Sequence, residues 1–397
     1  MNFHRLLLAG LLLLQGAVAV RAADGPGKSM AAVLQPFVDE GTLAGAVTLV
    51  ASKEKVLSLE VVGYSDVKER KAMKTDALFW IASMSKPMTA TALMMLVDEG
   101  KLAIEDPVEK YLPEFKGQML GVEQDQEHVL LKKPLRPITV KDILSHSSGL
   151  PFMSRVERKI DTFSLRTATI SYALTPLKTQ PGSKYDYSNA GINTVGRIVE
   201  VVSGMPYEAF MEQRLFKPLG MKDTTFWPTA SQLKRLAKSY KPNAAKDGLE
   251  ETTIDQLTYP LTDRKRGPSP AGGYFSTALD VSIFCRMILN GGVYGGKRYV
   301  SEAAVRQMTS TQTGTLLDKD KRENGYGLGW STSRKASEQA VIPGSCGHGG
   351  AYATHMGIDP KRGLVTVFMV QHAGYPGTNG AKIQPAFLKA AEGLKSE

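Results

Sequence analysis

A hydroxyl and an amine stand three residues apart, at Ser83 and Lys86, where the stretch 79–90 is predicted to enter a helix. On a helix this spacing puts both groups on one face. A serine hydroxyl is a poor nucleophile until a base removes its proton. A lysine can be that base once desolvation or nearby positive charge lowers its pKa from about 10.4. The spacing therefore predicts Ser83 as a nucleophile activated by Lys86.

The residues after this pair, 89–99, are mostly strong helix formers and end at Gly100. Ser83 is thus expected at the positive end of the helix dipole, which favours developing negative charge. Pro87 is easy only in a first turn and biases Lys86 away from the helical region, which leaves the first residue of the helix open. Taken alone, Ser-x-x-Lys is a weak signal that an N-cap serine and a solvated lysine also produce.

Two further stretches carry groups suited to the same chemistry. In residues 185–191, a phenol such as that of Tyr187 can shuttle a proton when positive charge favours its ionisation, and the amide of Asn189 can hold a substrate carbonyl. In residues 347–351, Gly349 and Gly350 beside His348 allow a substrate to lie against the backbone. Singly, the first is a turn before a helix and the second is a glycine hairpin turn.

The composition is that of a folded enzyme. The 397 residues are 42% apolar and 22% charged, which suits two or three domains or one large α/β unit with an inserted subdomain. The net charge of +10 is scattered, without the basic and aromatic stripe of a nucleic-acid site, so no nucleic-acid partner is expected. The six histidines show no metal-ligand spacing, and no metal or other cofactor is expected.

Residues 1–22 are predicted to be a signal peptide. Arg5 precedes an apolar stretch too short to span a bilayer, and small residues follow Arg21 as a cleavage site. An uncleaved anchor is the alternative. The mature enzyme is expected to be periplasmic or secreted, without a stable membrane anchor. Cys285 and Cys346 fall in a predicted helix and a predicted strand, so two buried thiols are expected although the compartment permits a bond.

Strand signals gather at the two ends of the chain and helix signals in its middle. The β-rich runs 46–52 and 56–62 predict an antiparallel hairpin, and runs 326–331, 351–358 and 364–371 predict late strands. Helices are expected at 278–289 and 384–394 and through most of 117–267. The predicted fold is therefore an antiparallel sheet flanked by helices, built from 23–116 and 268–397 around a helical subdomain, 117–267.

In the order Ser83-x-x-Lys86, Tyr187-x-Asn189 and His348-Gly-Gly350, the three motifs resemble the serine β-lactamase and penicillin-binding protein superfamily, specifically its class C β-lactamase-like branch. The resemblance also covers 143–150, 218–221 and 325–330. It implies an α/β subdomain from both chain ends around a helical one, with the site at their junction. The implied roles are an acylated nucleophile (Ser83), a proton-transfer pair (Lys86, Tyr187), substrate-binding groups (Asn189, His348, Gly349, Gly350) and an oxyanion hole of the Ser83 and Ala351 backbone N–H groups.

The departure from the family pattern is His348, where β-lactamases and carboxypeptidases usually have the lysine of K-T-G that meets a substrate carboxylate. Histidine is mostly neutral at pH 7 and anchors a carboxylate less well. The replacement of that lysine by a histidine resembles the pattern of the family VIII carboxylesterases and related D-aminopeptidases. The expected activity is a secreted carboxylesterase on short-chain esters, a small-molecule ester or amide being its partner, with weak β-lactam hydrolysis. A class C β-lactamase, a D-amino-acid-specific peptidase and a penicillin-binding sensor without turnover are the alternatives.

Two other serines are candidates for the nucleophile of an α/β-hydrolase. Ser147 and Ser345 each lack the first glycine of the G-x-S-x-G elbow. Neither is clearly placed between a strand and a helix. The sequence therefore disfavours an α/β-hydrolase.

Overall fold

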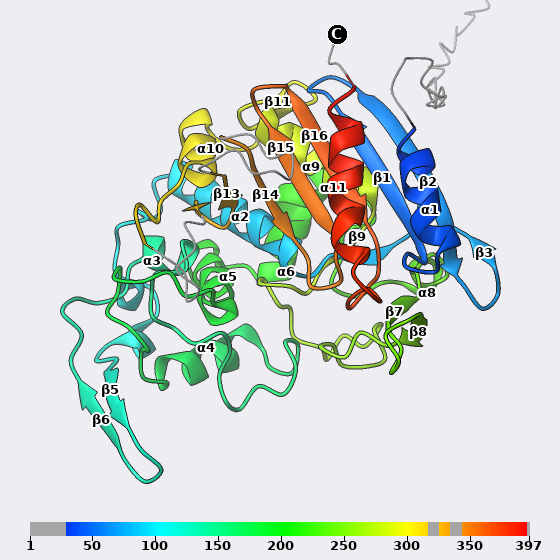
Figure 1. Cartoon of the computed structure of the whole chain (residues 1–397). Helices are drawn as coiled ribbons and strands as arrows, with labels where there is room; N and C mark the ends of the chain where they lie inside the picture. Colours follow the sequence, from blue (N-terminus) through cyan, green and yellow to red (C-terminus); the bar gives the residue numbers. More distant parts are fainter. Residues whose placement is uncertain (1–28, 317–324, 334–343, 395–397) are drawn as a thin grey trace, which may run out of the picture.

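The computed structural model describes residues 29–316, 325–333 and 344–394 (Figure 1). The expected signal peptide lies outside these ranges. An eight-stranded antiparallel sheet of order β12-β13-β14-β15-β16-β1-β2-β3 forms the centre. Its strands are β1 (Gly45–Ala51), β2 (Val56–Asp66), β3 (Lys71–Ala72), β12 (Gly325–Tyr326), β13 (Ser331–Thr332), β14 (Cys346–Gly349), β15 (His355–Asp359) and β16 (Leu364–Met369).

The two ends of the chain meet inside this sheet. β1 pairs with β16, with Val47 opposite Met369, and with β2 in the expected hairpin. Every residue of β1 is buried, because helices cover both faces (Figure 1). The helices α1 (Met30–Asp39) and α11 (Gly380–Ala391) pack on one face, and α9 (Ala278–Leu289) packs against β1, β15 and β16 on the other. The antiparallel sheet built from both chain ends is thus confirmed.

The helix that follows Ser83 is α2 (Ser85–Asp98), preceded by the 3-10 turn η1 (Ala82–Met84). Pro87 is its third residue, where the missing N–H removes no intrahelical bond. The first residue of the helix, which the sequence left open, is Ser85, and Lys86 is helical despite the local bias of Pro87. After Asp98 the chain turns away at Gly100, whose φ is +69°.

The middle of the chain, 117–267, is less helical than expected, because long loops join its helices and it contains two antiparallel hairpins that the sequence did not predict. These are β5 (Leu120–Gln124) with β6 (Val129–Lys132), and β7 (Ser239–Pro242) with β8 (Leu249–Thr252). Every residue of β6 is exposed, so burial imposes no alternating pattern that could reveal the strand. Figure 1 shows β5–β6 projecting from the body of the molecule.

The remaining elements connect these layers. The helical ones are η2 (Val108–Lys110), η3 (Pro113–Phe115), α3 (Val140–Leu144), α4 (Leu165–Ala173), α5 (Asn189–Ser203), α6 (Tyr207–Phe210), η4 (Met211–Phe216), α7 (Lys217–Leu219), α8 (Ala230–Leu233) and α10 (Glu302–Thr309). Two short ladders join β4 (Phe79–Trp80) to β9 (Phe275–Ser276), and β10 (Val293–Tyr294) to β11 (Lys297–Arg298). The first ladder ties the segment leading to Ser83 to the segment that follows the helical region.

Two late strands differ from their expected bounds. Run 326–331 is not one strand, because the chain turns through Gly327 and Gly329 between β12 and β13. Run 351–358 enters β15 only at His355, since residues 350–354 form a turn closed by the Gly350 N–H and the Thr354 carbonyl at 2.7 Å. Both turns bring backbone close to Ser83 or Lys86.

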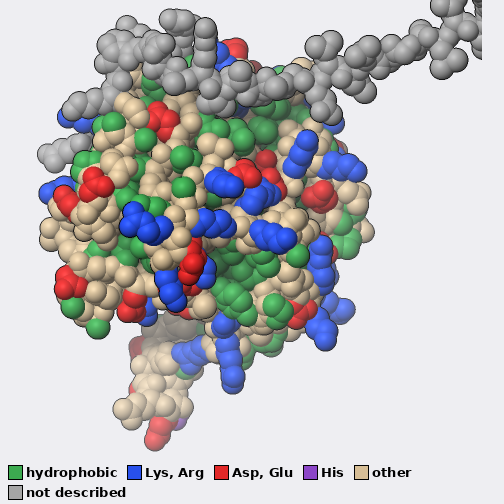
Figure 2. Space-filling model, turned by 90° about the vertical axis from the view of Figure 1, so that its right-hand side faces the viewer, with side chains coloured by type: hydrophobic (Ala, Val, Ile, Leu, Met, Phe, Trp, Pro, Cys, Tyr) green, Lys and Arg blue, Asp and Glu red, His purple; other side chains and the backbone are tan. Residues whose placement is uncertain are grey.

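The two cysteines are buried and unbonded, Cys285 in α9 and Cys346 in β14. Burial raises the pKa of the Cys346 thiol to about 12. On the face shown in Figure 2, Lys and Arg side chains are interspersed with Asp and Glu. In the part of the chain that the structure describes, no helix has the length and apolar character needed to cross a bilayer.

Candidate active site

Ser83 lies in a tight turn between β4 and α2. Ala82, directly before it, has φ of 45°, a strained conformation for a residue with a side chain. The turn is held by the Ile81 N–H, which donates to the Tyr274 carbonyl at 2.9 Å, and by the Ser85 hydroxyl, which donates to the Ala82 carbonyl at 2.6 Å. Strain of this kind is common where a side chain must be presented for chemistry. Ser83 itself remains partly accessible.

Lys86 is fully buried and makes three contacts through Nζ. Nζ lies 3.0 Å from Ser83 Oγ, 2.8 Å from Asn189 Oδ1 and 2.7 Å from the Ala271 carbonyl oxygen. Burial holds the pKa of Lys86 well below its ordinary value, which favours the neutral amine. The two carbonyl oxygens can only accept, so they take the two N–H groups of that amine. Its lone pair is then left for the Ser83 hydroxyl proton.

The Ala271 carbonyl and Asn193 support Lys86, and the sequence analysis missed both. The Ala271 N–H donates to Asn193 Oδ1 at 3.0 Å, and Asn193 Nδ2 donates to the Tyr172 hydroxyl at 3.0 Å. Asn189 and Asn193 lie one turn apart on α5, so one helix fixes two of the three contacts of Lys86. The two asparagines four residues apart could have been recognised in the sequence as sharing one helix face. The contact of the Ala271 carbonyl could not, because any residue has a backbone carbonyl.

Tyr187 lies beside both groups. Its ring centroid is 4.7 Å from Lys86 Nζ, and the Ser83 side chain is close enough to lower the pKa of its hydroxyl. Burial nevertheless raises the pKa of the Tyr187 phenol above its ordinary value, with the Ser83 contact opposing it. This is opposite to the direction expected from a neighbouring positive charge, because desolvation dominates and Lys86 is itself driven toward neutrality. The phenol therefore holds its proton at neutral pH.

The ring of His146 packs against that of Tyr187. The His146 Nδ1 accepts the Ser188 N–H at 3.1 Å, and its ring lies 4.4 Å from that of Tyr187 and 4.5 Å from that of Tyr326. His146 adopts φ of 58° and is fully buried, which lowers its pKa well below the ordinary value. Ser188 is also the N-cap of α5, where its hydroxyl accepts the Gly191 N–H at 2.9 Å. Folding of this helix start thus places Tyr187.

His348 is buried in β14, and both of its ring nitrogens are engaged. Its Nδ1 lies 2.8 Å from the Gly349 carbonyl, which can only accept, so Nδ1 carries the hydrogen. Its Nε2 then accepts from the Tyr326 hydroxyl at 3.1 Å. Burial, with the charge of Lys86 second, lowers the pKa of His348 to about 3. The side chain is neutral at pH 7 and has no N–H left for a substrate carboxylate.

Gly350 brings the end of β14 against the Ser83 turn. A Cβ on Gly350 would lie 2.6 Å from the Ile81 carbonyl and 2.1 Å from Thr354 Oγ1, so only glycine fits. No acceptor among the described residues binds the Ala351 N–H. The Ser83 N–H lies in the first turn of η1, where N–H groups have no intrahelical acceptor. Two unpaired backbone donors on segments in contact can stabilise an oxyanion.

The rival serine of the 145–149 run has no such arrangement. Ser147 is buried, and its hydroxyl lies 3.0 Å from Ser145 Oγ and 3.3 Å from Asp142 Oδ1. No histidine of the described chain is hydrogen-bonded to it. This serine therefore lacks the base that a Ser-His triad requires.

Comparison with known proteins defines the class. The family model Beta-lactamase matches residues 30–390, and the chain belongs to that family. An uncharacterised protein of Mycobacterium tuberculosis is 33% identical over 371 residues, covering 86% of this chain and 89% of the relative. A Salmonella agona protein provisionally named D-alanyl-D-alanine carboxypeptidase is 30% identical over 333 residues, covering 78% and 73%. The superfamily resemblance drawn from the three motifs is confirmed.

Solved structures agree on the fold. EstCE1, a hydrolase with promiscuous acyltransferase activity, superposes with a TM-score of 0.76 at 23% identity over 91% of this chain and 97% of its own. Simvastatin synthase (LovD) from Aspergillus terreus gives 0.77 at 19% identity over 91% and 96%. A penicillin-binding protein homologue from Caulobacter crescentus gives 0.74 at 22% over 92% and 96%. Identities this low show the shared fold alone.

Proposed function

We propose that this chain is a serine hydrolase that forms an acyl-enzyme at Ser83 and turns over short-chain carboxylic esters. The observation that carries the proposal is the buried amine of Lys86, which is held by two carbonyl acceptors with Ser83 Oγ at 3.0 Å. A neutral amine so placed can act as a general base for the serine. The family relationship supports a hydrolase, and the finer choice of substrate rests on His348.

In acylation the Ser83 proton passes to Lys86 as Oγ bonds to the carbonyl carbon of the ester. The carbonyl oxygen takes the negative charge beside the N–H groups of Ser83 and Ala351. When the carbon–oxygen bond to the leaving group breaks, the proton moves from Lys86 through the Tyr187 hydroxyl to the leaving oxygen. An alcohol departs and the acyl group remains on Ser83.

In deacylation a water molecule gives a proton to the same pair and its oxygen bonds to the acyl carbon. The bond to Ser83 Oγ then breaks, Oγ regains a proton, and the carboxylic acid departs. Because Tyr187 keeps its proton at neutral pH, it serves as a relay rather than as a phenolate base. Asn189 orients Lys86 through Oδ1 and can offer its Nδ2 group to the substrate carbonyl.

Preference for esters follows from His348. A β-lactam or a peptide stem ends in a carboxylate, and a charge-assisted hydrogen bond to it contributes about 1.5–3 kcal/mol. His348 is neutral, and its only ring N–H is already donated to the Gly349 carbonyl. A simple ester needs only the nucleophile, the two backbone donors and an apolar acyl pocket. Hydrolysis of such an ester therefore does not depend on a cation at residue 348.

A second candidate function is a D-amino-acid-specific peptidase, favoured by the similarity to the Salmonella protein named for D-alanyl-D-alanine carboxypeptidase activity. A third is a penicillin-binding sensor that acylates without turnover, and a class C β-lactamase is the fourth. The predicted signal peptide at residues 1–22 favours a periplasmic or secreted enzyme in each case. The candidates differ in which substrate acylates the enzyme and in whether that acyl-enzyme is then hydrolysed.

A parallel assay separates them. Purified protein is given p-nitrophenyl butyrate, a chromogenic cephalosporin and a peptide ending in D-alanyl-D-alanine, and intact mass is followed in each mixture. The proposal expects the highest kcat/KM with the ester and a transient acyl adduct at Ser83. Efficient cephalosporin turnover with negligible ester activity would identify a β-lactamase. A long-lived β-lactam adduct without ester turnover would identify the sensor.

A further inference from the structure

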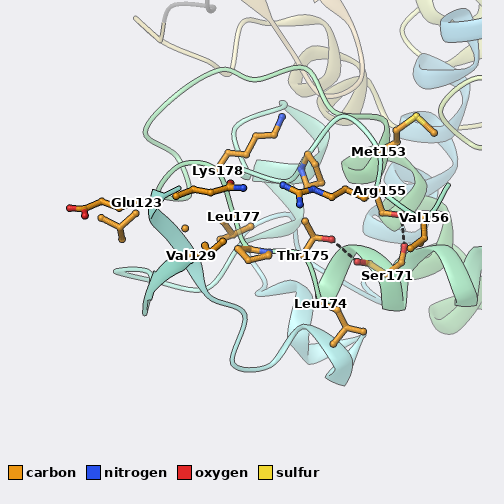
Figure 3. A pocket seen from close by; sticks show the side chains of 16 residues that line it. Glu123, Val129, Met153, Arg155, Val156, Ser171, Leu174, Thr175, Leu177 and Lys178 are labelled. Carbon is orange, nitrogen blue, oxygen red and sulfur yellow. Dashed lines mark hydrogen bonds between the residues drawn. The ribbon is translucent and has the colours of Figure 1, made fainter. Parts of the chain in front are cut away.

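A separate pocket lies outside the Ser83 turn, between hairpin β5–β6, α4 and the loop 151–156 (Figure 3). Its volume is about 700 Å³. The apolar part of its lining includes Val122, Val129, Val156, Leu174 and Leu177. The first four of these side chains are 49%, 47%, 60% and 79% exposed, an unusual concentration of open apolar surface. Such surface is expected to be covered by an apolar group.

Of the two basic side chains of this lining that the structure describes, Arg155 is exposed and without an ion-pair partner, whereas Lys178 is paired. No described acid lies within ion-pair distance of its guanidinium. Lys178 is paired with Asp186 at 3.5 Å. In Figure 3 Arg155 extends across the pocket, whereas Glu123 points away from it. An unpaired guanidinium above an apolar wall selects an anion attached to an apolar chain.

The loop that lines the pocket also contacts the Ser83 site, through Phe152. The Phe152 carbonyl accepts the N–H groups of Asn189 at 2.9 Å and Ala190 at 3.0 Å, and its ring is stacked on Tyr187 with centroids 6.3 Å apart. The residues on either side of it, Pro151 and Met153, line the pocket. A substrate with its ester at Ser83 can therefore reach the pocket by passing over Phe152.

We infer that the pocket of Arg155, Val122, Val129, Val156, Leu174 and Leu177 binds the distal part of the substrate, an apolar chain ending in a carboxylate. The role in catalysis rests on the proposed ester hydrolysis, whereas binding does not. The cationic anchor for a carboxylate, which His348 does not provide beside the scissile bond, is thereby replaced by Arg155 far from it. The substrate class is an ester whose acyl part carries a terminal carboxylate beyond a run of methylene groups.

Binding is tested without catalysis, in Ser83→Ala, by titration calorimetry with octanoate and with uncharged octanamide. One charge-assisted contact predicts about tenfold tighter binding of octanoate. Adding Arg155→Gln should abolish that difference. Adding Leu174→Asp, at an exposed apolar residue of the lining, should weaken the binding of both ligands. Arg158→Gln, an exposed arginine outside the lining, is the matched control and should change nothing. Absence of octanoate binding, or binding unchanged by Arg155→Gln, overturns the inference.

Turnover is tested with p-nitrophenyl monoesters of dicarboxylic acids of four to twelve carbons, each paired with the methyl-ended ester of equal length. At the length that spans from Ser83 to Arg155, the carboxylate-ended ester should have about tenfold higher kcat/KM, through KM. Arg155→Gln should remove this advantage, whereas Arg158→Gln should retain it and leave p-nitrophenyl acetate hydrolysis within about twofold of the wild type. If the wild type cleaves no ester, the proposed function fails while the calorimetry still decides the pocket. If esters are cleaved but the terminal carboxylate raises kcat/KM at none of the chain lengths, the substrate class is refuted.

Discussion

Asn189 Oδ1 accepts a hydrogen bond from Lys86 Nζ at 2.8 Å, with both side chains buried. This contact links the first residue of α5 to the first turn of α2, and hence the helical region to the segment that carries Ser83. An uncharged acceptor fixes the direction of the amine without raising its pKa, as a carboxylate would. The choice of amide over acid at residue 189 thus keeps Lys86 available as a base.

The first prediction concerns that choice. Asn189→Asp places a carboxylate beside Lys86, and an opposite charge within about 4 Å raises the amine pKa by about one to three units. Because activity needs the neutral amine, the acidic limb of the kcat/KM profile should move to higher pH by at least about one unit. Asn189→Ala, which removes the acceptor without adding charge, should lower kcat without that upward shift. If the acidic limb of the kcat/KM profile of Asn189→Asp coincides with that of the wild type, Lys86 is excluded as the base.

The second prediction is that Ser83, Lys86 and Tyr187 act as a unit. Ser83→Ala should lower kcat/KM for an aryl ester at least about a thousandfold. Lys86→Ala and Tyr187→Phe should each be severe alone but add little to Ser83→Ala, because all three serve one proton transfer. Single and double variants are compared by steady-state kinetics, with circular dichroism to check folding. Full activity of Ser83→Ala would end the assignment.

The third prediction uses two adjacent glycines. Gly350→Ala puts a Cβ 2.6 Å from the Ile81 carbonyl, so the end of β14 must move away from the Ser83 turn. Loss of one oxyanion donor lowers kcat by about a hundredfold to a thousandfold, and a fall of that order is expected. Gly349→Ala is the matched control, since the nearest atom to its Cβ is 3.7 Å away, an ordinary contact. Equal losses in the two variants would show that Gly350 has no special role in placing the Ala351 N–H.

The fourth prediction concerns substrate preference at His348. His348→Lys supplies a cation where the wild type has a neutral ring, and should raise cephalosporin hydrolysis relative to ester hydrolysis by about one to two decades. Both kcat/KM values are measured for each protein. Tyr326→Phe, which removes the partner of His348 Nε2 without adding charge, is the control and should leave the ratio near the wild-type value. A wild type that prefers cephalosporin would contradict the role given to this residue.

The fifth prediction is a pH dependence of stability that has its origin in Asp280. Burial raises the pKa of this carboxyl to about 6, although the Asp223 N–H at 2.7 Å and the Thr224 hydroxyl at 3.0 Å donate to it. The unfolded chain has a pKa near about 3.9, so between about pH 4 and 6 the folded state binds more protons. Its contribution to the free energy of unfolding is therefore largest below about pH 4 and is lost as pH rises through 6.

Asp280→Asn cannot ionise and removes this dependence. Relative to wild type, the variant should gain about 2–3 kcal/mol in free energy of unfolding on going from pH 4 to pH 7.5. Urea unfolding of both proteins at the two pH values measures the difference. A constant difference across this range would show that Asp280 has an ordinary pKa.

Much of the catalytic arrangement was predictable from local pattern. The Ser-x-x-Lys spacing brings Ser83 Oγ within 3.0 Å of Lys86 Nζ, with Ser83 in the turn η1 and Lys86 in the first turn of α2, because 85–98 has the residues of a helix and ends near Gly100. The hairpin of β1 and β2 and the helix α9 followed from hydrophobic periodicity, which acts over neighbouring residues. The three motifs in order then implied the family and the sheet from both chain ends.

The electrostatic state of the site depended on tertiary structure. The Ala271 carbonyl reaches Lys86 across 185 residues, and a backbone acceptor has no sequence signature. The pKa of Tyr187 is raised because of how deeply packing buries it, and burial depth depends on distant segments. His348 donates its one N–H to the carbonyl of the adjacent Gly349, but its lone pair accepts from Tyr326 only once β12 and β14 join the same sheet. Residue types and spacing are local properties, so the sequence carried them, whereas solvation and long-range hydrogen bonds exist only in the folded chain.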